Sequence, residues 1–141
     1  MKINRLSVFG LCAAVSLLAS AQSIDPPKEK LVNLADLEAR NPFDGIYSKS
    51  VYTYTTALFF ITIEAGSSSA HHNHAEEQTM VFHSGRVRAI VDDREYEVGE
   101  GDVLVIPAWV PHQMVAIEDS SWTEIHGAGI NNSRAFEMAG N

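Results

Sequence analysis

The stretch GSSSAHHNHAEEQTMVFHSG, residues 66–85, carries four of the six histidines of this 141-residue chain. Alternate side chains of an extended strand lie on one face, so we expect His72 and His74 to project together and His71 to point away. Gln78 returns to that face if the strand phase survives the intervening turn. Two imidazoles and an amide oxygen on one face would form part of a site for a divalent ion. On this spacing alone, a solvated histidine patch on an acidic turn is an equally good interpretation.

A second stretch, GDVLVIPAWVPHQM at residues 101–114, supplies a further imidazole. His112 follows the bend between Pro107 and Pro111 and opens another expected strand, so it is the natural candidate for a third histidine ligand. Together the two stretches strongly resemble the two signature motifs of the cupin superfamily. The matching positions are Gly66, His72, His74, Gln78 and Gly85 in the first motif and Gly101, Pro107 and His112 in the second.

The sequence departs from the cupin pattern at three positions. Trp109 replaces a glycine of the second motif, and Ala116 stands where asparagine is usual. Gln78 occupies the position of the family's metal-binding glutamate. The turn before His112 must therefore be made by a residue with a large side chain, and the ligand set differs from the usual one.

The resemblance implies an all-β fold: a double-stranded β-helix, or jelly-roll barrel, formed by a single cupin domain with a short N-terminal arm. It also implies one divalent transition metal (Mn, Fe, Ni, Zn, Co or Cu) and a homodimer. The implied metal ligands are His72, His74, Gln78 and His112. The sequence pattern independently indicates an all-β sandwich or barrel, because short β-branched and aromatic runs end at turn signals such as Ser84-Gly85.

The beginning of the chain, residues 1–21, resembles a secretory signal. A basic start at Lys2 and Arg5 precedes an apolar run, and small residues precede a cut before Gln22. The apolar run is too short to span a bilayer as a stable anchor. The sequence therefore predicts a secreted or periplasmic protein that has no membrane anchor after cleavage.

Behind the signal we expect an arm at residues 22–50 with one short helix capped by Asn33, a barrel at residues 51–130 and a tail at residues 131–141. Cleavage would remove the only cysteine, Cys12, so no disulfide would hold the fold. It would also remove two basic residues, which moves the formal net charge from −8 to −10. A chain this acidic lacks the basic surface that binding to nucleic acid or anionic lipid requires. The expected partner is a small-molecule substrate.

The amide of Gln78 bears on the chemistry, because a carboxylate ligand lowers the net charge of a metal site and an amide does not. Three neutral imidazoles and one amide leave a divalent ion with its full charge, which favours Lewis-acid chemistry over higher oxidation states. Within the cupins, such a set resembles those of certain cyclases and isomerases. We expect an isomerase, cyclase or lyase acting on a small oxygenated substrate. The alternatives are an oxygen-dependent dioxygenase and a non-catalytic, metal-dependent small-molecule binding module.

An amide ligand cannot act as a general base, so another residue must transfer any proton. The candidates are Glu76, Glu77 and His126, with Tyr52 or Tyr54 as further choices. A solvated turn is the alternative interpretation for the two glutamates, and Glu77 would replace the glutamine as ligand if the turn were bulged. A surface position is the alternative for His126.

Overall fold

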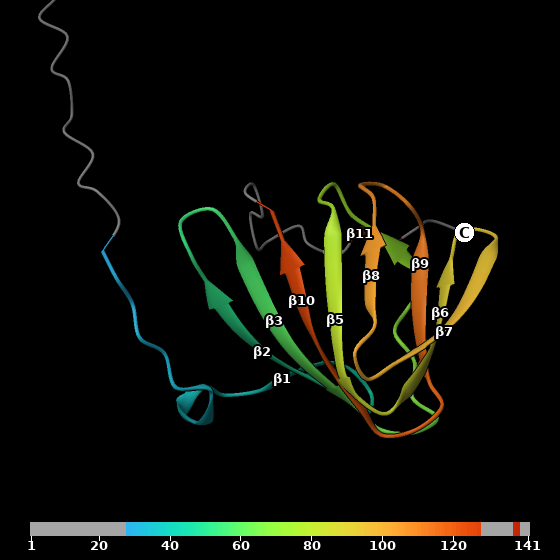
Figure 1. Ribbon diagram of the computed structural model, residues 1–141, viewed down its shortest axis with the longest axis horizontal. Helices are drawn as coiled ribbons and strands as arrows, with labels where there is room; N and C mark the ends of the chain where they lie inside the picture. The colour runs from blue at the N-terminus through green and yellow to red at the C-terminus, as the bar shows by residue number, and fades with distance from the viewer. Residues whose placement is uncertain (1–27, 128–136, 139–141) are drawn as a thin grey trace, which may run out of the picture.

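The computed structural model describes residues 28–127 and 137–138, and antiparallel strands form almost all of its regular structure (Figure 1). A short 3-10 helix, η1 (Leu34–Asp36), precedes the strands. The strands in chain order are β1 (Arg40–Phe43), β2 (Ile46–Tyr52), β3 (Ala57–Ile63), β4 (His72–Asn73), β5 (Gln78–Ser84), β6 (Arg86–Val91), β7 (Arg94–Gly99), β8 (Val103–Ile106), β9 (His112–Ala116), β10 (Ser120–His126) and β11 (Glu137–Met138). The all-β fold predicted from the sequence is confirmed.

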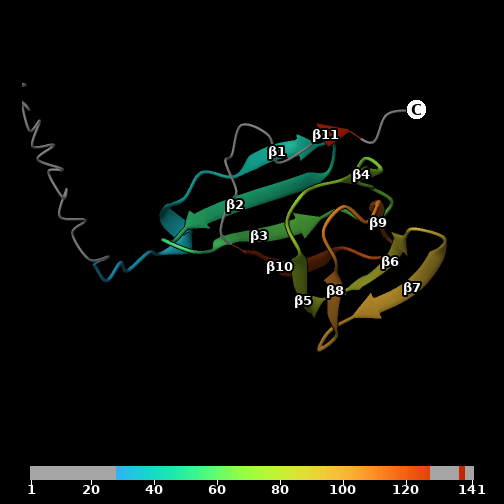
Figure 2. The same ribbon diagram turned by 90° about the horizontal axis from the view of Figure 1, so that it is seen from above.

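The strands form two antiparallel sheets that curve around a common interior (Figures 1 and 2). One sheet has the order β1-β2-β3-β10-β5-β8, and the other has the order β11-β4-β9-β6-β7. The largest fully buried apolar side chains are Met80, Phe82, Ile106 and Val87, which come from both sheets. Burial of this apolar surface is the main favourable contribution to folding.

The pairing of β5 with β10 decides which polar side chains enter the interior. Gln78, Met80 and Phe82 alternate along β5 and are buried. Across the ladder, Gln78 lies opposite His126 and Met80 lies opposite Glu124. Because residues that are directly opposite in an antiparallel pair project to the same face, Glu124 and His126 enter the interior beside Gln78.

The predicted N-terminal arm is corrected in part. Asn33 caps η1 as expected, because its Oδ1 accepts a hydrogen bond from the Ala35 N–H at 3.0 Å. However, β1 and most of β2 also fall within residues 22–50, and β2 pairs with β3 along its whole length. The sheet therefore begins at Arg40 and not at the expected residue 51. Pairing of β2 with β3, and of β1 with β2, makes these residues part of the sheet, despite the proline in β1.

Most of the residues in the predicted signal and tail are not described by the structure. The predicted signal, residues 1–21, lies outside the described residues, as does most of the predicted tail at residues 131–141. Within that tail, β11 pairs with β4. In the described part of the chain, no helix has the length and apolar character needed to cross a membrane.

Gly85 closes the first motif, and its replacement tests the fold. Gly85 and Gly66 both have positive φ angles, of 76° and 82°. A Cβ atom at Gly85 would lie 2.7 Å from the Cα of Ser120, whereas a Cβ at Gly66 would meet nothing within 4 Å. We expect Gly66→Ala to cost about 1 kcal/mol of unfolding free energy from the left-handed backbone alone. We expect Gly85→Ala to cost at least about 2 kcal/mol more, because of the clash.

Urea denaturation of the two variants, monitored by tryptophan fluorescence, measures this difference. Gly66→Ala is the matched control, since it shares the backbone conformation but not the clash. Equal losses in the two variants would show that the close approach of residues 119–120 to Gly85 is not a constraint on the fold.

Candidate metal centre

Three histidines, two from the segment around β4 and one from β9, lie close together in the interior. His72 lies in β4 directly opposite His112 at the start of β9, and His74 follows β4. One ring nitrogen of each lies within 4.8 Å of the others, and all three side chains are buried. His71, in contrast, is exposed, as the alternation of side chains predicted, and His83 is exposed as well. The three histidines are therefore close enough to hold one metal ion.

The backbone fixes the orientation of all three rings in the same way. Each Nδ1 donates to a backbone carbonyl two residues away at 2.9 Å, the acceptors being the carbonyl oxygens of Ala70, Glu76 and Val110. A carbonyl oxygen can only accept, so the proton of each neutral ring lies on Nδ1 and the lone pair lies on Nε2. Metal-binding imidazoles in proteins are commonly held by such a hydrogen bond from the other nitrogen.

Gln78 completes a donor set suited to a cation. Its Oε1 lies 2.8 Å from Nε2 of His74, so two lone pairs face each other. If the Gln78 amide were rotated, its N–H could donate to Nε2 of His74, but this would leave Nε2 of His112 unchanged. That atom is also buried without a hydrogen-bond partner among the described residues. A cation between these atoms would satisfy both nitrogens. Ligand atoms about 3 Å apart are also expected around a metal with bonds of about 2.1 Å. The residues present therefore fit a divalent metal.

Burial favours the neutral, metal-binding form of His72 and His112. Burial lowers the pKa of His112 to about 4, against a partly compensating hydrogen bond to Val110. Burial likewise lowers the pKa of His72 below its usual value. Both rings are thus unprotonated near neutral pH, which is the form that coordinates a metal.

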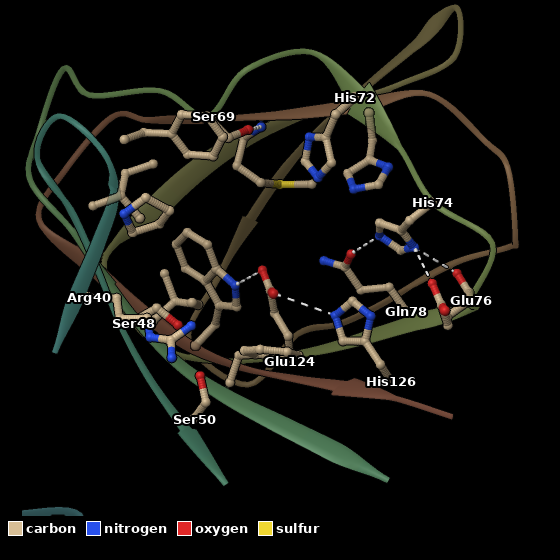
Figure 3. Close-up of a pocket in the computed structure, with 18 of the residues that line it drawn as sticks. Arg40, Ser48, Ser50, Ser69, His72, His74, Glu76, Gln78, Glu124 and His126 are labelled. Carbon is tan, nitrogen blue, oxygen red and sulfur yellow. Dashed lines mark hydrogen bonds and ion pairs between the residues drawn. The ribbon is translucent and has the colours of Figure 1, made fainter. Parts of the chain in front are cut away.

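The histidines face a cavity of about 360 Å³. Figure 3 shows His72, His74 and Gln78 on one side of this space and Arg40, Ser48 and Ser50 on the opposite side. The walls between them are largely apolar and aromatic, formed by Phe43, Ile46, Tyr52, Phe59, Ile61, Met114 and Trp122. A volume of this size accommodates a small organic molecule.

A carboxylate and a fourth imidazole also line the cavity. Glu124 Oε1 accepts a hydrogen bond from the indole N–H of Trp122 at 2.9 Å. Its Oε2 lies 3.5 Å from Nε2 of His126, an ion-pair distance without hydrogen-bond geometry (Figure 3). Burial alone would raise the pKa of Glu124, but the neighbouring His126 and the Trp122 N–H outweigh it and hold that pKa below its usual value. The His126 ring in turn lies 5.0 Å from the His74 ring, centroid to centroid.

The predicted proton-transfer residues separate into those inside and those outside the cavity. Glu76 and His126 line it, as does Tyr52, whereas Tyr54 is 71% exposed. Glu77 is exposed and does not line the cavity, which corrects the expectation of a role for it there. The physical reason is that β5 begins one residue later, so the alternation turns Glu77 outward and the next side chain inward.

Trp109, which stands where the motif has glycine, lies in the turn that precedes His112. Its φ angle of 65° lies in the left-handed region that favours glycine. Its backbone N–H donates to the carbonyl of His74 at 2.7 Å, while its side chain is 59% exposed. The backbone at this position thus ties the two ligand-bearing segments together, and the indole does not line the cavity.

Two charged residues of the cavity were not among the predicted site residues. The sequence does place Glu124 on the same face of its strand as Trp122 and His126, but it does not mark Glu124 as a base. Arg40 gave no signal, because it reaches the cavity only through the pairing of β1 with β2.

Comparisons with known proteins agree with this architecture. The family model described as "Cupin domain" matches residues 59–125. The uncharacterised protein SCO3923 of Streptomyces coelicolor is 28% identical over 91 residues, which cover 64% of this chain and 87% of that protein.

Solved structures share the fold at low sequence identity. An RmlC-like cupin from Shewanella frigidimarina is 16% identical with a TM-score of 0.69, covering 76% of this chain and 97% of that one. The polyketide cyclase RemF from Streptomyces resistomycificus is 18% identical with a TM-score of 0.64, covering 72% and 81%. Likeness at these identities shows the fold alone. The family match over residues 59–125 and the two motifs identify a cupin domain in this chain, and the shared fold agrees with this.

Proposed function

We propose that this cupin is a metal-dependent enzyme that moves a proton on a small oxygenated substrate, in an isomerisation, cyclisation or elimination. The observation that carries the proposal is that Glu124 faces the same cavity as the three histidines and Gln78. The cavity therefore joins a candidate cation site to a partly buried carboxylate base. The similarity to a polyketide cyclase is compatible with this class of reaction.

His72, His74, Gln78 and His112 would hold the metal. When bound, a divalent ion in this neutral donor set supplies Lewis-acid polarisation of a substrate oxygen. The three Nδ1 hydrogen bonds fix the rings before the ion arrives, so little ordering is required on binding. The apolar walls exclude water from the substrate.

Glu124 is the proton acceptor in this proposal. The Trp122 N–H and the neighbouring His126 favour its ionised form, and the hydrogen bond to Trp122 orients one oxygen so that the other faces the cavity. His126 lies beside both Glu124 and His74, so it is placed to stabilise the carboxylate and to return the proton. General acid–base transfer of this kind contributes about 10²- to 10⁴-fold to rate.

We infer in addition that the protein is exported, on the strength of the signal-like sequence at residues 1–21. The cavity volume of about 360 Å³ supports the proposal of a small-molecule substrate. A dioxygenase is the second candidate, because three histidine ligands leave open positions at a metal. The neutral amide of Gln78 argues against it, since it does not offset the charge of an oxidised ion.

The metal site is tested by removing one ligand. His112→Ala should reduce metal content from one ion per chain to a small fraction, since losing a ligand lowers affinity by at least about 100-fold. Elemental analysis of protein purified from the periplasm and dialysed measures this. The matched control is His83→Ala, because His83 is exposed and outside the cavity. Full metal occupancy in His112→Ala would show that the site is wrongly assigned.

Removing the metal should make stability depend on pH in a defined direction. In the metal-free folded protein, His112 binds a proton only near pH 4, whereas the unfolded chain binds it near 6.5. The unfolded state thus holds more protons between these values, so stability falls as the pH is lowered from 6.5 to 4. The contribution of His112 is at most about 3 kcal/mol.

Chelator-treated wild type and His112→Gln, unfolded in urea at several pH values, separate this contribution from that of other groups. The variant should show a shallower fall in unfolding free energy across the window. The same slope in both proteins would mean that His112 is not buried in its neutral form.

The role of Glu124 is tested with Glu124→Gln, whose amide oxygen can still accept the Trp122 hydrogen bond. Turnover should fall by about 10²- to 10⁴-fold while metal content is unchanged. The assay follows deuterium incorporation from D₂O into a panel of sugar acids and keto acids by NMR. Glu95→Gln, on the exposed face of β7, is the control. Unchanged exchange in Glu124→Gln would contradict the mechanism, and turnover that requires oxygen would favour the dioxygenase.

A further inference from the structure

A single arginine lies at the side of the cavity opposite the histidines. Arg40, in β1, is the only arginine or lysine among the described residues that line the cavity (Figure 3). Within the described part of the chain, its guanidinium forms no ion pair. Arg86, by comparison, contacts both Glu97 and Glu118 at 3.0 Å. Arg40 is therefore a charged donor that the protein itself does not neutralise.

Two hydroxyl groups share the inward face with this arginine. Arg40 lies directly opposite Ser48 in the pairing of β1 with β2, and Ser50 follows at the next inward position of β2. Both serines line the cavity, and Ser48 is 8% exposed. Among the described residues, neither hydroxyl has a hydrogen-bond partner. A guanidinium flanked by two free hydroxyls offers a set of donors that matches the two oxygens of a carboxylate.

The charges of the cavity also favour an anion. The chain as a whole has a net charge of −8, yet this end of the cavity carries the positive Arg40. A metal held by neutral ligands would keep its full positive charge at the other end. Glu124 lies between the two ends and repels a second negative group from the middle of the cavity (Figure 3). The arrangement suits a molecule with one carboxylate at one end and hydroxyl or carbonyl oxygens at the other.

We propose that Arg40, with Ser48 and Ser50, binds the carboxylate of a small hydroxy acid or keto acid and directs its oxygenated carbons toward the histidines. This inference rests on the proposed function for the orientation of the substrate, since it takes the histidine end as the reacting end. Arg40 is thereby a specificity-determining residue: it selects acids over neutral analogues of the same shape.

The test compares three hydroxy acids with their neutral amides: glycolate with glycolamide, D-lactate with D-lactamide, and D-glucuronate with D-glucuronamide. Binding to the full chain is measured by calorimetry, with Zn²⁺ bound and again after chelation. At least one acid should bind the wild type about tenfold or more tightly than its amide, since hydrogen bonds to a charged group have that magnitude. Arg40→Gln should abolish the preference in both metal states and leave zinc content unchanged.

Arg88→Gln is the matched control, because Arg88 is exposed on β6 and does not line the cavity. It should keep the wild-type preference. If no acid is preferred over its amide, or if Arg40→Gln keeps the preference, the inference is overturned; in the second case the carboxylate binds elsewhere. If the wild type exchanges no proton with any acid of the earlier panel but keeps the acid preference, the proposed function is overturned and this inference stands.

Discussion

The three hydrogen bonds from histidine Nδ1 atoms to backbone carbonyls are the constraint on which the site depends. Each bond lies within a short local segment, so the loop conformation itself sets the ring orientation. The bonds also place every lone pair on Nε2, facing the interior. The backbone of these segments thus orients the donor set, and burial in the barrel lowers the pKa values of His72 and His112, which favours their neutral form.

Much of the fold was predictable because its strands alternate and end at clear turn signals. The expected turn at Ser84-Gly85, for example, separates β5 from β6. The failure at residues 40–50 has a physical cause. Neither alternation nor composition marks β1, an edge strand that contains a proline, so only its hydrogen bonds to β2 define it. Such pairing is a tertiary property that local sequence does not encode.

The part of the candidate site that lies within the two motifs was predictable from the sequence. The spacing of His72, His74 and Gln78 follows from strand alternation, and the structure brings them together with His112. The cavity beyond them was not predictable, because Arg40 enters it through a ladder between separate strands. Whether a glutamate on an inward face remains ionised depends on partners across the fold, which a single strand pattern does not reveal.

The candidate ligands come from both sheets, since His72 and His112 lie in the sheet of β4 and β9 and Gln78 lies in the sheet of β5. An ion at this position would cross-link the two sheets, much as a disulfide joins the layers of many exported proteins. The only cysteine of this chain lies in the signal-like segment, at position 12. In an environment where reducing agents are scarce and proteases abundant, a coordination bond between sheets would protect the fold by a route that needs no thiol oxidation.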